Sequence, residues 1–123
     1  MPPADLPTLL WCFFGFRGRI GREPFVLSLI IAILLAAVAL GPMILVENEQ
    51  VQLSQYALPI LLLSQVVQFA LAFKRLHDIG RTGLFAIVLI FPFVNIAFVV
   101  FLAIFPGEPG PNRFGDRPNV PPP

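Results

Sequence analysis

The sequence predicts an all-α integral membrane protein with about three apolar helices. Apolar residues make up 57% of the 123 residues, charged residues only 12%, and mean hydropathy is +0.84. Soluble domains usually carry about 25% charged residues, and a chain this short has too little interior to bury so many apolar side chains. Three stretches of about twenty residues carry no charge, and lipid is the solvent that suits them. The length predicts one membrane domain over residues 1–118, followed by a mobile Pro-rich end at 119–123.

The charge balance and the scarcity of metal ligands exclude several classes of site. The net charge is +1, so the chain lacks the broad basic field of a nucleic-acid-binding protein. Cys12 is the single cysteine and His77 the single histidine, which excludes an internal disulfide and a multi-thiolate metal centre. We therefore expect no metal, no cofactor and no nucleic-acid partner.

The first uncharged stretch covers residues 25–46. As a helix its 22 residues would reach about 33 Å, against a hydrocarbon core of about 30 Å. Pro24 suits a first helical turn, and Gly41-Pro42 predicts a bend at the far end. The arginines before this stretch and Ala37-Val38-Ala39 also imitate a secretory signal with its cleavage site, but the apolar run continues beyond the alanines and favours a membrane helix.

The second and third stretches cover residues 53–73 and 84–105. Gln65 and Gln68 lie in the second, where they predict either hydrogen bonds to other helices or a polar pathway. Two full spans would need about 40 residues, so the third stretch is one helix kinked at Pro92 or a re-entrant pair of half-helices. We expect the single kinked helix. A short interfacial segment precedes the first helix, and an irregular Pro/Gly-rich tail follows the third.

The turns between these helices predict the orientation. Three arginines precede the first helix, and three further cations follow the second, whereas residues 47–50 between them form a short acidic turn. Cations accumulate on the cytoplasmic side of membrane helices. We therefore expect a multi-pass protein with a cytoplasmic N-terminus. The tail would lie outside with three spans, and in the cytoplasm with a re-entrant third stretch.

The basic turn after the second helix contains the most specific local pattern. Arg75, Asp78 and Arg81 are three residues apart, so one carboxylate can organise two guanidiniums on one helical face. Gly80 is placed to end the second helix, and Thr82 to cap the next. The dyad His77-Asp78 resembles the metal-binding pair of HD-type phosphohydrolases, but such a centre needs several ligands from separate helices, so the pair alone is weak support for an enzyme.

Three motifs together resemble a known family. They are Phe16-x-Gly18-Arg19-x-x-Arg22-x-x-Phe25, Arg75-Leu76-His77-Asp78-x-Gly80-Arg81-x-Gly83 and Pro106-Gly107-x-Pro109-Gly110-x-Asn112-Arg113-Phe114-Gly115. In this order they are similar to the signatures of an uncharacterised bacterial inner-membrane family, catalogued as domain of unknown function 805. The resemblance implies a small bacterial inner-membrane protein without an assigned reaction. If the three motifs meet on one face, the re-entrant alternative gains weight.

These observations predict a non-enzymatic membrane protein whose cytoplasmic cations bind anionic lipid headgroups or a membrane partner. The alternatives are a subunit of a small-solute transporter or channel, based on the intramembrane amides, and a membrane enzyme using His77 and Asp78. Besides the lipid bilayer, expected partners are anionic phospholipid, another membrane protein or a homo-oligomer. Candidate residues for headgroup or partner binding are Arg19, Arg22, Arg75, His77, Asp78, Arg81, Asn112 and Arg113; no catalytic residue is expected.

Overall fold

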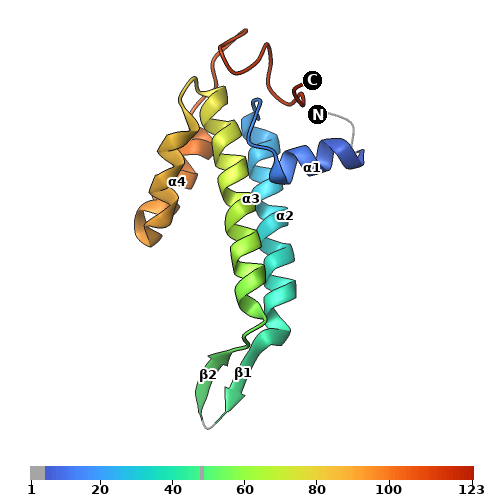
Figure 1. The fold of residues 1–123 in the computed structure, drawn as a ribbon. Helices are drawn as coiled ribbons and strands as arrows, with labels where there is room; N and C mark the ends of the chain where they lie inside the picture. The colour runs from blue at the N-terminus through green and yellow to red at the C-terminus, as the bar shows by residue number, and fades with distance from the viewer. Residues whose placement is uncertain (1–4, 48) are drawn as a thin grey trace.

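Two long helices that lie side by side form the shaft of the molecule (Figure 1). The computed structural model describes residues 5–47 and 49–123. Helix α2 (Arg22–Leu40) runs down the shaft and helix α3 (Ala57–Asp78) runs back up. Strands β1 (Ile44–Glu47) and β2 (Gln50–Leu53) join them as an antiparallel hairpin. Helix α1 (Leu6–Phe14) crosses the shaft close to the opposite end, where α2 begins and α3 ends.

Helix α1 is the predicted short N-terminal segment. The Asp5 side chain caps it by accepting a hydrogen bond of 2.9 Å from the backbone N–H of Thr8, and Pro7 lies in the first turn, where its missing N–H costs nothing. Leu6 and Leu10 face outward and are more than half exposed. A short apolar helix with Trp11 and two phenylalanines, lying across the end of the bundle, suits the interface between lipid and water.

The first predicted helix ends earlier than expected. It stops at Leu40, and residues Gly41–Met43 form a 3-10 turn before β1. The prediction that the helix continues to residue 46 is therefore wrong. Pro42 cannot donate the next helical hydrogen bond, and the β-branched Ile44 and Val46 favour extended backbone, where they pair with Leu53 and Val51. The predicted acidic turn is the hairpin turn between the strands; Asn48 lies outside the described residues.

Helix α3 is displaced towards the C-terminus relative to the predicted range of 53–73. It begins at Ala57, with Pro59 in the first turn, and extends through the basic residues to Asp78. Gly80 ends it at φ +85°, as predicted. The backbone N–H of Arg81 donates to the carbonyl of Leu76 (2.8 Å) and that of Gly80 to the carbonyl of His77 (3.1 Å), which is a Schellman motif. The cations at 74 and 75 are thus helical.

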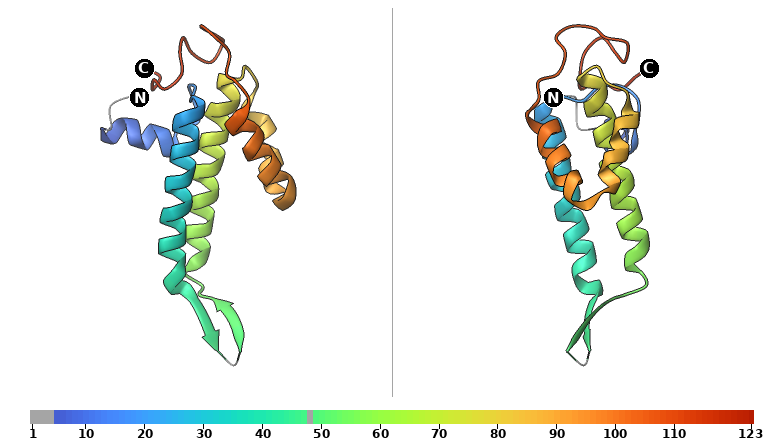
Figure 2. Two further views of the ribbon diagram at one scale, coloured as in Figure 1. Left: turned by 180° about the vertical axis from the view of Figure 1, so that it is seen from behind. Right: turned by 90° about the vertical axis from the view of Figure 1, so that its left-hand side faces the viewer.

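The third apolar stretch is a helical hairpin. The 3-10 helix η2 (Gly83–Ile90) starts at the capping residue Thr82, Phe91 is extended, and helix α4 (Pro92–Ile104) runs back. Both ends of the hairpin lie at the C-terminus of α3, where the backbone N–H of Glu108 donates to the carbonyl of Asp78 at 2.7 Å (Figure 2). The expected single kinked helix is therefore wrong and the alternative pair of short segments is right, because an extended residue before Pro92 reverses the chain.

Helices α2 and α3 are the described elements long and apolar enough to cross a membrane, whereas α4 has 13 residues. In the most apolar part of α2 only 11% of the residues are buried, and in that of α3 33%. A core helix of a soluble protein would be mostly buried, so these exposed apolar faces agree with lipid as the solvent. The compact core lies in the half of the shaft beside η2 and α4, around Leu71, Leu76, Leu89 and Leu102.

The tail after α4 is irregular, as predicted, and folds back over the start of α2. Asn112 and Gly115 form an isolated bridge. The Asn119 side chain accepts a hydrogen bond of 2.8 Å from the backbone N–H of Gly21, and the Asn119 N–H donates to the carbonyl of Arg19 at 2.9 Å. Asn119 therefore attaches the tail to the residues before α2. The mobility of residues 119–123 stays a prediction.

Close packing of η2 on α3 leads to a test of the hairpin. A Cβ added to Gly83 would lie 2.2 Å from the Phe73 ring, so Gly83→Ala should lower the free energy of unfolding by about 1–3 kcal/mol. Gly41→Ala is the control, since Gly41 is helical and has no heavy atom within 4 Å of its added Cβ; it should be neutral or slightly stabilising. Thermal unfolding in detergent micelles measures both. Equal midpoints for the two variants would contradict this packing.

Candidate functional site

The last turn of α3 gathers the polar residues that hold this end of the molecule together. It contains Lys74, Arg75, His77 and Asp78, and successive side chains on a helix point about 100° apart. Together the four side chains reach α1, α4, the segment before α2 and the tail. The Gly80 turn directly afterwards sends the backbone away and leaves room for the tail.

Asp78 lies between two buried guanidiniums. Its Oδ1 accepts from Nε of Arg19 at 3.0 Å and lies 2.9 Å from Nη2 of Arg19, while its Oδ2 is 2.5 Å from Nη1 of Arg75. The side chains of both arginines are fully buried and that of Asp78 is 5% exposed. Buried ions are tolerated where each is paired and hydrogen-bonded, and this triad meets that condition.

Arg19 also anchors the tail. Its Nη1 donates to the carbonyls of Gly110 (2.7 Å) and Gly115 (3.2 Å), and its Nη2 to the carbonyl of Glu108 (2.7 Å). With the bond from Nε to Asp78, the guanidinium donates four hydrogen bonds, and its Nη2 also forms an ion pair with Asp78. A Cβ on Gly107 would lie 2.0 Å from Oδ2 of Asp78. The tail backbone can therefore approach the triad only because residue 107 has no side chain.

Arg75 caps the C-terminus of α4. Its Nε donates to the carbonyl of Leu102 at 2.7 Å, its Nη2 donates to the carbonyl of Phe105, and its Nη1 donates to the carbonyl of Ile20 at 3.2 Å. The last carbonyls of a helix have no partner within the helix and carry its negative dipole end. A buried guanidinium both donates hydrogen bonds to these carbonyls and places a positive charge at the negative end of the helix dipole.

Lys74 caps the C-terminus of α1. Its Nζ donates to the carbonyls of Trp11 (2.9 Å), Cys12 (2.7 Å) and Gly15 (2.5 Å), and it lies 5.2 Å from the centre of the Trp11 ring. All three ammonium donors are used. Lys74 is one of the three cations after the second apolar stretch that predicted the orientation, and its side chain is buried and holds α1 against the shaft.

His77 connects the first and third motifs. Its Nδ1 lies 3.0 Å from the carbonyl oxygen of Gly18, and its ring stacks on Phe114 with centroids 4.0 Å apart and planes at 8°. The Asn112 amide donates to the His77 carbonyl at 2.9 Å. The three motifs that were predicted to belong together therefore meet at one end of the bundle.

The predicted pairing of Asp78 with Arg75 and Arg81 is half right. Arg75 is a partner, but Arg81 is exposed and the second partner is Arg19, 59 positions earlier in the chain. The left-handed Gly80 directs the chain away before Arg81 can fold back. Spacing within one helix predicts the contact at i, i+3, whereas a single sequence carries no signal for the contact with Arg19.

Burial divides the candidate binding residues into two groups. Arg19, Arg75 and Asp78 are enclosed by the protein, so in this arrangement they contact no external ligand. His77 and Asn112 are half-buried within the same cluster, whereas Arg22, Arg81 and Arg113 are exposed. Two exposed arginines that were not on the candidate list, Arg17 and Arg117, lie at the same end.

The cluster offers little to acid–base or metal chemistry. Both oxygens of Asp78 accept from guanidiniums, and the His77 ring is held by Gly18 and Phe114. Within residues 5–47 and 49–123, no three side chains of the His, Cys, Asp and Glu types converge as a metal site would require. The arrangement is that of a structural hydrogen-bond network that joins distant segments of the chain.

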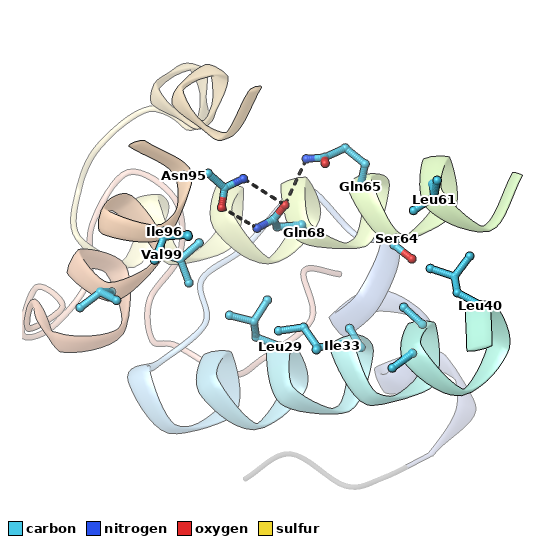
Figure 3. Close-up of a pocket in the computed structure, with 14 residues that line it drawn as sticks. Leu29, Ile33, Leu40, Leu61, Ser64, Gln65, Gln68, Asn95, Ile96 and Val99 are labelled. Carbon is cyan, nitrogen blue, oxygen red and sulfur yellow. Dashed lines mark hydrogen bonds between the residues drawn. The ribbon is translucent and has the colours of Figure 1, made fainter. Parts of the chain in front are cut away.

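Two of the hollows around this scaffold have polar residues that bear on function. One of about 520 Å³ lies between Gly18 and the tail, with Arg113, Asp116 and Arg117 on its walls. The other, of about 580 Å³, is an apolar groove between α2, α3 and α4 (Figure 3). Gln68 and Asn95 meet there, since Nε2 of Gln68 donates to Oδ1 of Asn95 at 3.1 Å. The predicted hydrogen bond to another segment is therefore confirmed for Gln68, whereas Gln65 bonds to Gln68 within α3.

The triad yields a stability prediction. Asp78→Asn keeps the shape of the side chain but leaves two buried guanidiniums without a counter-charge, and should lower the free energy of unfolding by about 3–5 kcal/mol. Asp116→Asn, the same change at an exposed position of the tail, should stay within about 0.5 kcal/mol of the unaltered protein. Thermal unfolding in micelles compares them. A small loss for Asp78→Asn would show that the buried charges are compensated in another way.

Comparison with known proteins agrees with the resemblance of the three motifs. A family model described as protein of unknown function, DUF805, matches residues 13–116. The chain is 34% identical to inner membrane protein YhaI of Escherichia coli (strain K12) over 112 residues, 90% of this chain and 92% of that protein. It is 29% identical to inner membrane protein YhaH of the same organism over 115 residues, 89% and 92% of the two chains. No solved structure matches the chain. The matched segment contains the whole last turn of α3 and its partner Arg19, and the chain belongs to the DUF805 family.

Proposed function

We propose that the protein crosses the bacterial inner membrane twice, through α2 and α3, with both termini in the cytoplasm. In this arrangement η2 and α4 enter the bilayer from the cytoplasmic side and return. Helix α3 would be about 33 Å long, whereas α4 reaches about 20 Å, which is too short for a hydrocarbon core of about 30 Å. The names of the relatives YhaI and YhaH support the inner membrane as the location.

The distribution of charge supports this orientation. All eight lysine and arginine residues lie at the end where α1, the last turn of α3 and the tail meet, together with five acidic residues, which gives that end a net charge of +3. The hairpin at the other end carries Glu47 and Glu49 without a cation, a net charge of −2. Cations are retained on the cytoplasmic side of the membrane.

We further propose that the protein has no catalytic role and binds anionic phospholipid headgroups with this cytoplasmic end. The observation that carries the proposal is that five of the eight cations stay exposed after the buried cluster has engaged the other three. They are Arg17, Arg22, Arg81, Arg113 and Arg117. Among the described residues, ion pairs within 4 Å are confined to Asp78 and its two arginines, so these five are available to an anion.

The hollow beside the tail is the best-formed place for a headgroup. Arg113 and Arg117 line it together with Gly18, and its volume of about 520 Å³ is within the range of small-molecule sites, about 300–1,000 Å³. The Arg113 guanidinium lies over the Phe114 ring, 4.7 Å from its centre, and this cation–π contact restrains its position. Arginine presents paired donors to phosphate oxygens, so two arginines that line the same hollow suit a phosphodiester.

The groove between α2, α3 and α4 was the basis for the alternative of a transporter or channel subunit. Three segments surround it and its remaining side is open, so one chain does not enclose a passage within its described residues. This alternative would require an oligomer. We therefore favour headgroup binding, for which the exposed cations of one chain are sufficient.

The orientation has a direct test with membrane-impermeant thiol labelling of cells. In a Cys12→Ser background, a cysteine introduced at Glu49 should react from the periplasm, and one at Asp116 should react only after the membrane is permeabilised. The reason is that the acidic hairpin and the basic tail belong on opposite sides. Labelling of both positions in intact cells would show that residues 84–105 cross the membrane.

Headgroup binding predicts selective retention of anionic lipid. Arg113→Gln with Arg117→Gln removes two cations, each worth about 1 kcal/mol at an anionic surface, so the phosphatidylglycerol bound in mixed phosphatidylglycerol/phosphatidylcholine nanodiscs should fall about tenfold or more. Arg113→Lys with Arg117→Lys, which keeps the charge, should retain most of it. Native mass spectrometry counts the bound lipid, and thermal unfolding checks the fold. Equal retention by both pairs and the unaltered protein would contradict the proposal.

A further inference from the structure

Gln65 presents an unsatisfied amide in the middle of the shaft. It lies nine residues before Lys74, about 14 Å along the helix from the charged end, and eight residues after the start of α3. In the two-span arrangement this is the hydrocarbon interior, where water does not supply the missing hydrogen bonds and each unsatisfied group is costly. The position therefore calls for a polar partner at the same depth.

The neighbouring amides satisfy one another but not Gln65. Oε1 of Gln68 accepts from Nε2 of Gln65 at 3.2 Å, and Nε2 of Gln68 donates to Oδ1 of Asn95 at 3.1 Å. The Asn95 amide donates to the carbonyl of Leu89 at 2.7 Å. Within residues 5–47 and 49–123, Oε1 of Gln65 and its second N–H have no partner. Figure 3 shows Gln65 at the outer end of this row of amides.

The surface around Gln65 is apolar and uncovered. Leu58, Leu61 and Leu62 are 59%, 42% and 60% exposed, and their spacing of three, four and seven residues from Gln65 places all four on one face of α3. The hairpin of η2 and α4 packs mainly against the other half of α3, around Leu71 and Leu76. Leu61 and Gln65 line the open groove between α2, α3 and α4, so this face is uncovered and adjoins that groove. A polar residue that borders a leucine face and has hydrogen-bonding capacity left can join two membrane helices.

We propose that a second copy of the chain docks on this face and that the two Gln65 amides hydrogen-bond to each other. The partial charges are complementary, because an amide presents a negative carbonyl and a positive N–H side by side. A two-fold axis along the membrane normal places the carbonyl of each Gln65 amide opposite the N–H of the Gln65 amide in the partner. Both copies share one orientation, so their Gln65 residues lie at the same depth. Lipid chains offer neither donor nor acceptor.

Self-association is independent of headgroup binding, since it uses residues at the opposite end of α3 from the exposed arginines. Membrane hydrogen bonds of this kind are individually weak, so the leucines provide most of the contact and the amide pair fixes its register. The dimer should therefore weaken by roughly three- to tenfold when Gln65 loses its amide, without loss of the fold.

The test uses the full chain in phosphatidylcholine vesicles, with energy transfer between donor- and acceptor-labelled copies measured over a range of protein-to-lipid ratios. The unaltered protein should show transfer above the random level, and Gln65→Leu should shift the midpoint to three- to tenfold higher protein density. Gln55→Leu, at an exposed amide outside this face, should leave the midpoint unchanged. Thermal unfolding confirms that each variant is folded.

Cysteine cross-linking locates the interface. In a Cys12→Ser background, oxidation should join Leu62→Cys copies into a covalent dimer, while Val38→Cys, on an exposed position of α2, should stay monomeric. Energy transfer at the random level together with no Leu62→Cys dimer would overturn the proposal. A dimer that forms through Leu62→Cys but is insensitive to Gln65→Leu would overturn the amide pairing, and cross-linking through Val38→Cys alone would assign the contact to another face.

Discussion

Buried positive charge at the end of α3 is the constraint on which the rest of the fold depends. Arg19, Lys74 and Arg75 are fully buried and Asp78 is the carboxylate among them, so the cluster carries an excess of two positive charges. Backbone carbonyls supply the remaining compensation, from the ends of α1 and α4 and from the tail. Because such charges are very unfavourable without partners, none of these segments can leave without exposing or orphaning a cation.

The same contacts explain how two short helices persist. Isolated helices of fewer than about 12–15 residues are marginal, and α1 has 9 residues and α4 has 13. Each ends with carbonyls that have no partner of their own. Lys74 and Arg75 satisfy these carbonyls from one turn of a neighbouring helix. The long helix therefore both positions the short ones and completes their hydrogen bonding, which makes the end of the bundle a cooperative unit.

The sequence predicted what depends on local composition. Hydropathy identified the apolar stretches and the membrane class, Gly80 marked the end of α3, and the i, i+3 spacing found the contact of Arg75 with Asp78. The sequence-based predictions failed where contacts between distant segments determine the structure. The length of residues 84–105 favoured one crossing, although Pro92 and the carbonyl-capping Arg75 favour a hairpin that returns. Arg81 looked equivalent to Arg75 in spacing, and the contact with Arg19 was visible only once the chain had folded.

The family motifs acquire a physical meaning from this geometry. Most of their polar residues, Arg19, Arg75, His77, Asp78 and Asn112, contact one another or the backbone, so folding alone is enough to explain them. In the proposal of headgroup binding, recognition belongs instead to the arginines that stay exposed, and three of these, Arg22, Arg81 and Arg113, are themselves motif residues. The two halves of the shaft differ accordingly: the charged end is closed by its own hydrogen bonds, whereas the leucine face around Gln65 is open and has hydrogen-bonding capacity left. The charged end therefore completes its hydrogen bonds within one chain, whereas the apolar half keeps the amide groups of Gln65 that the proposed second copy would satisfy.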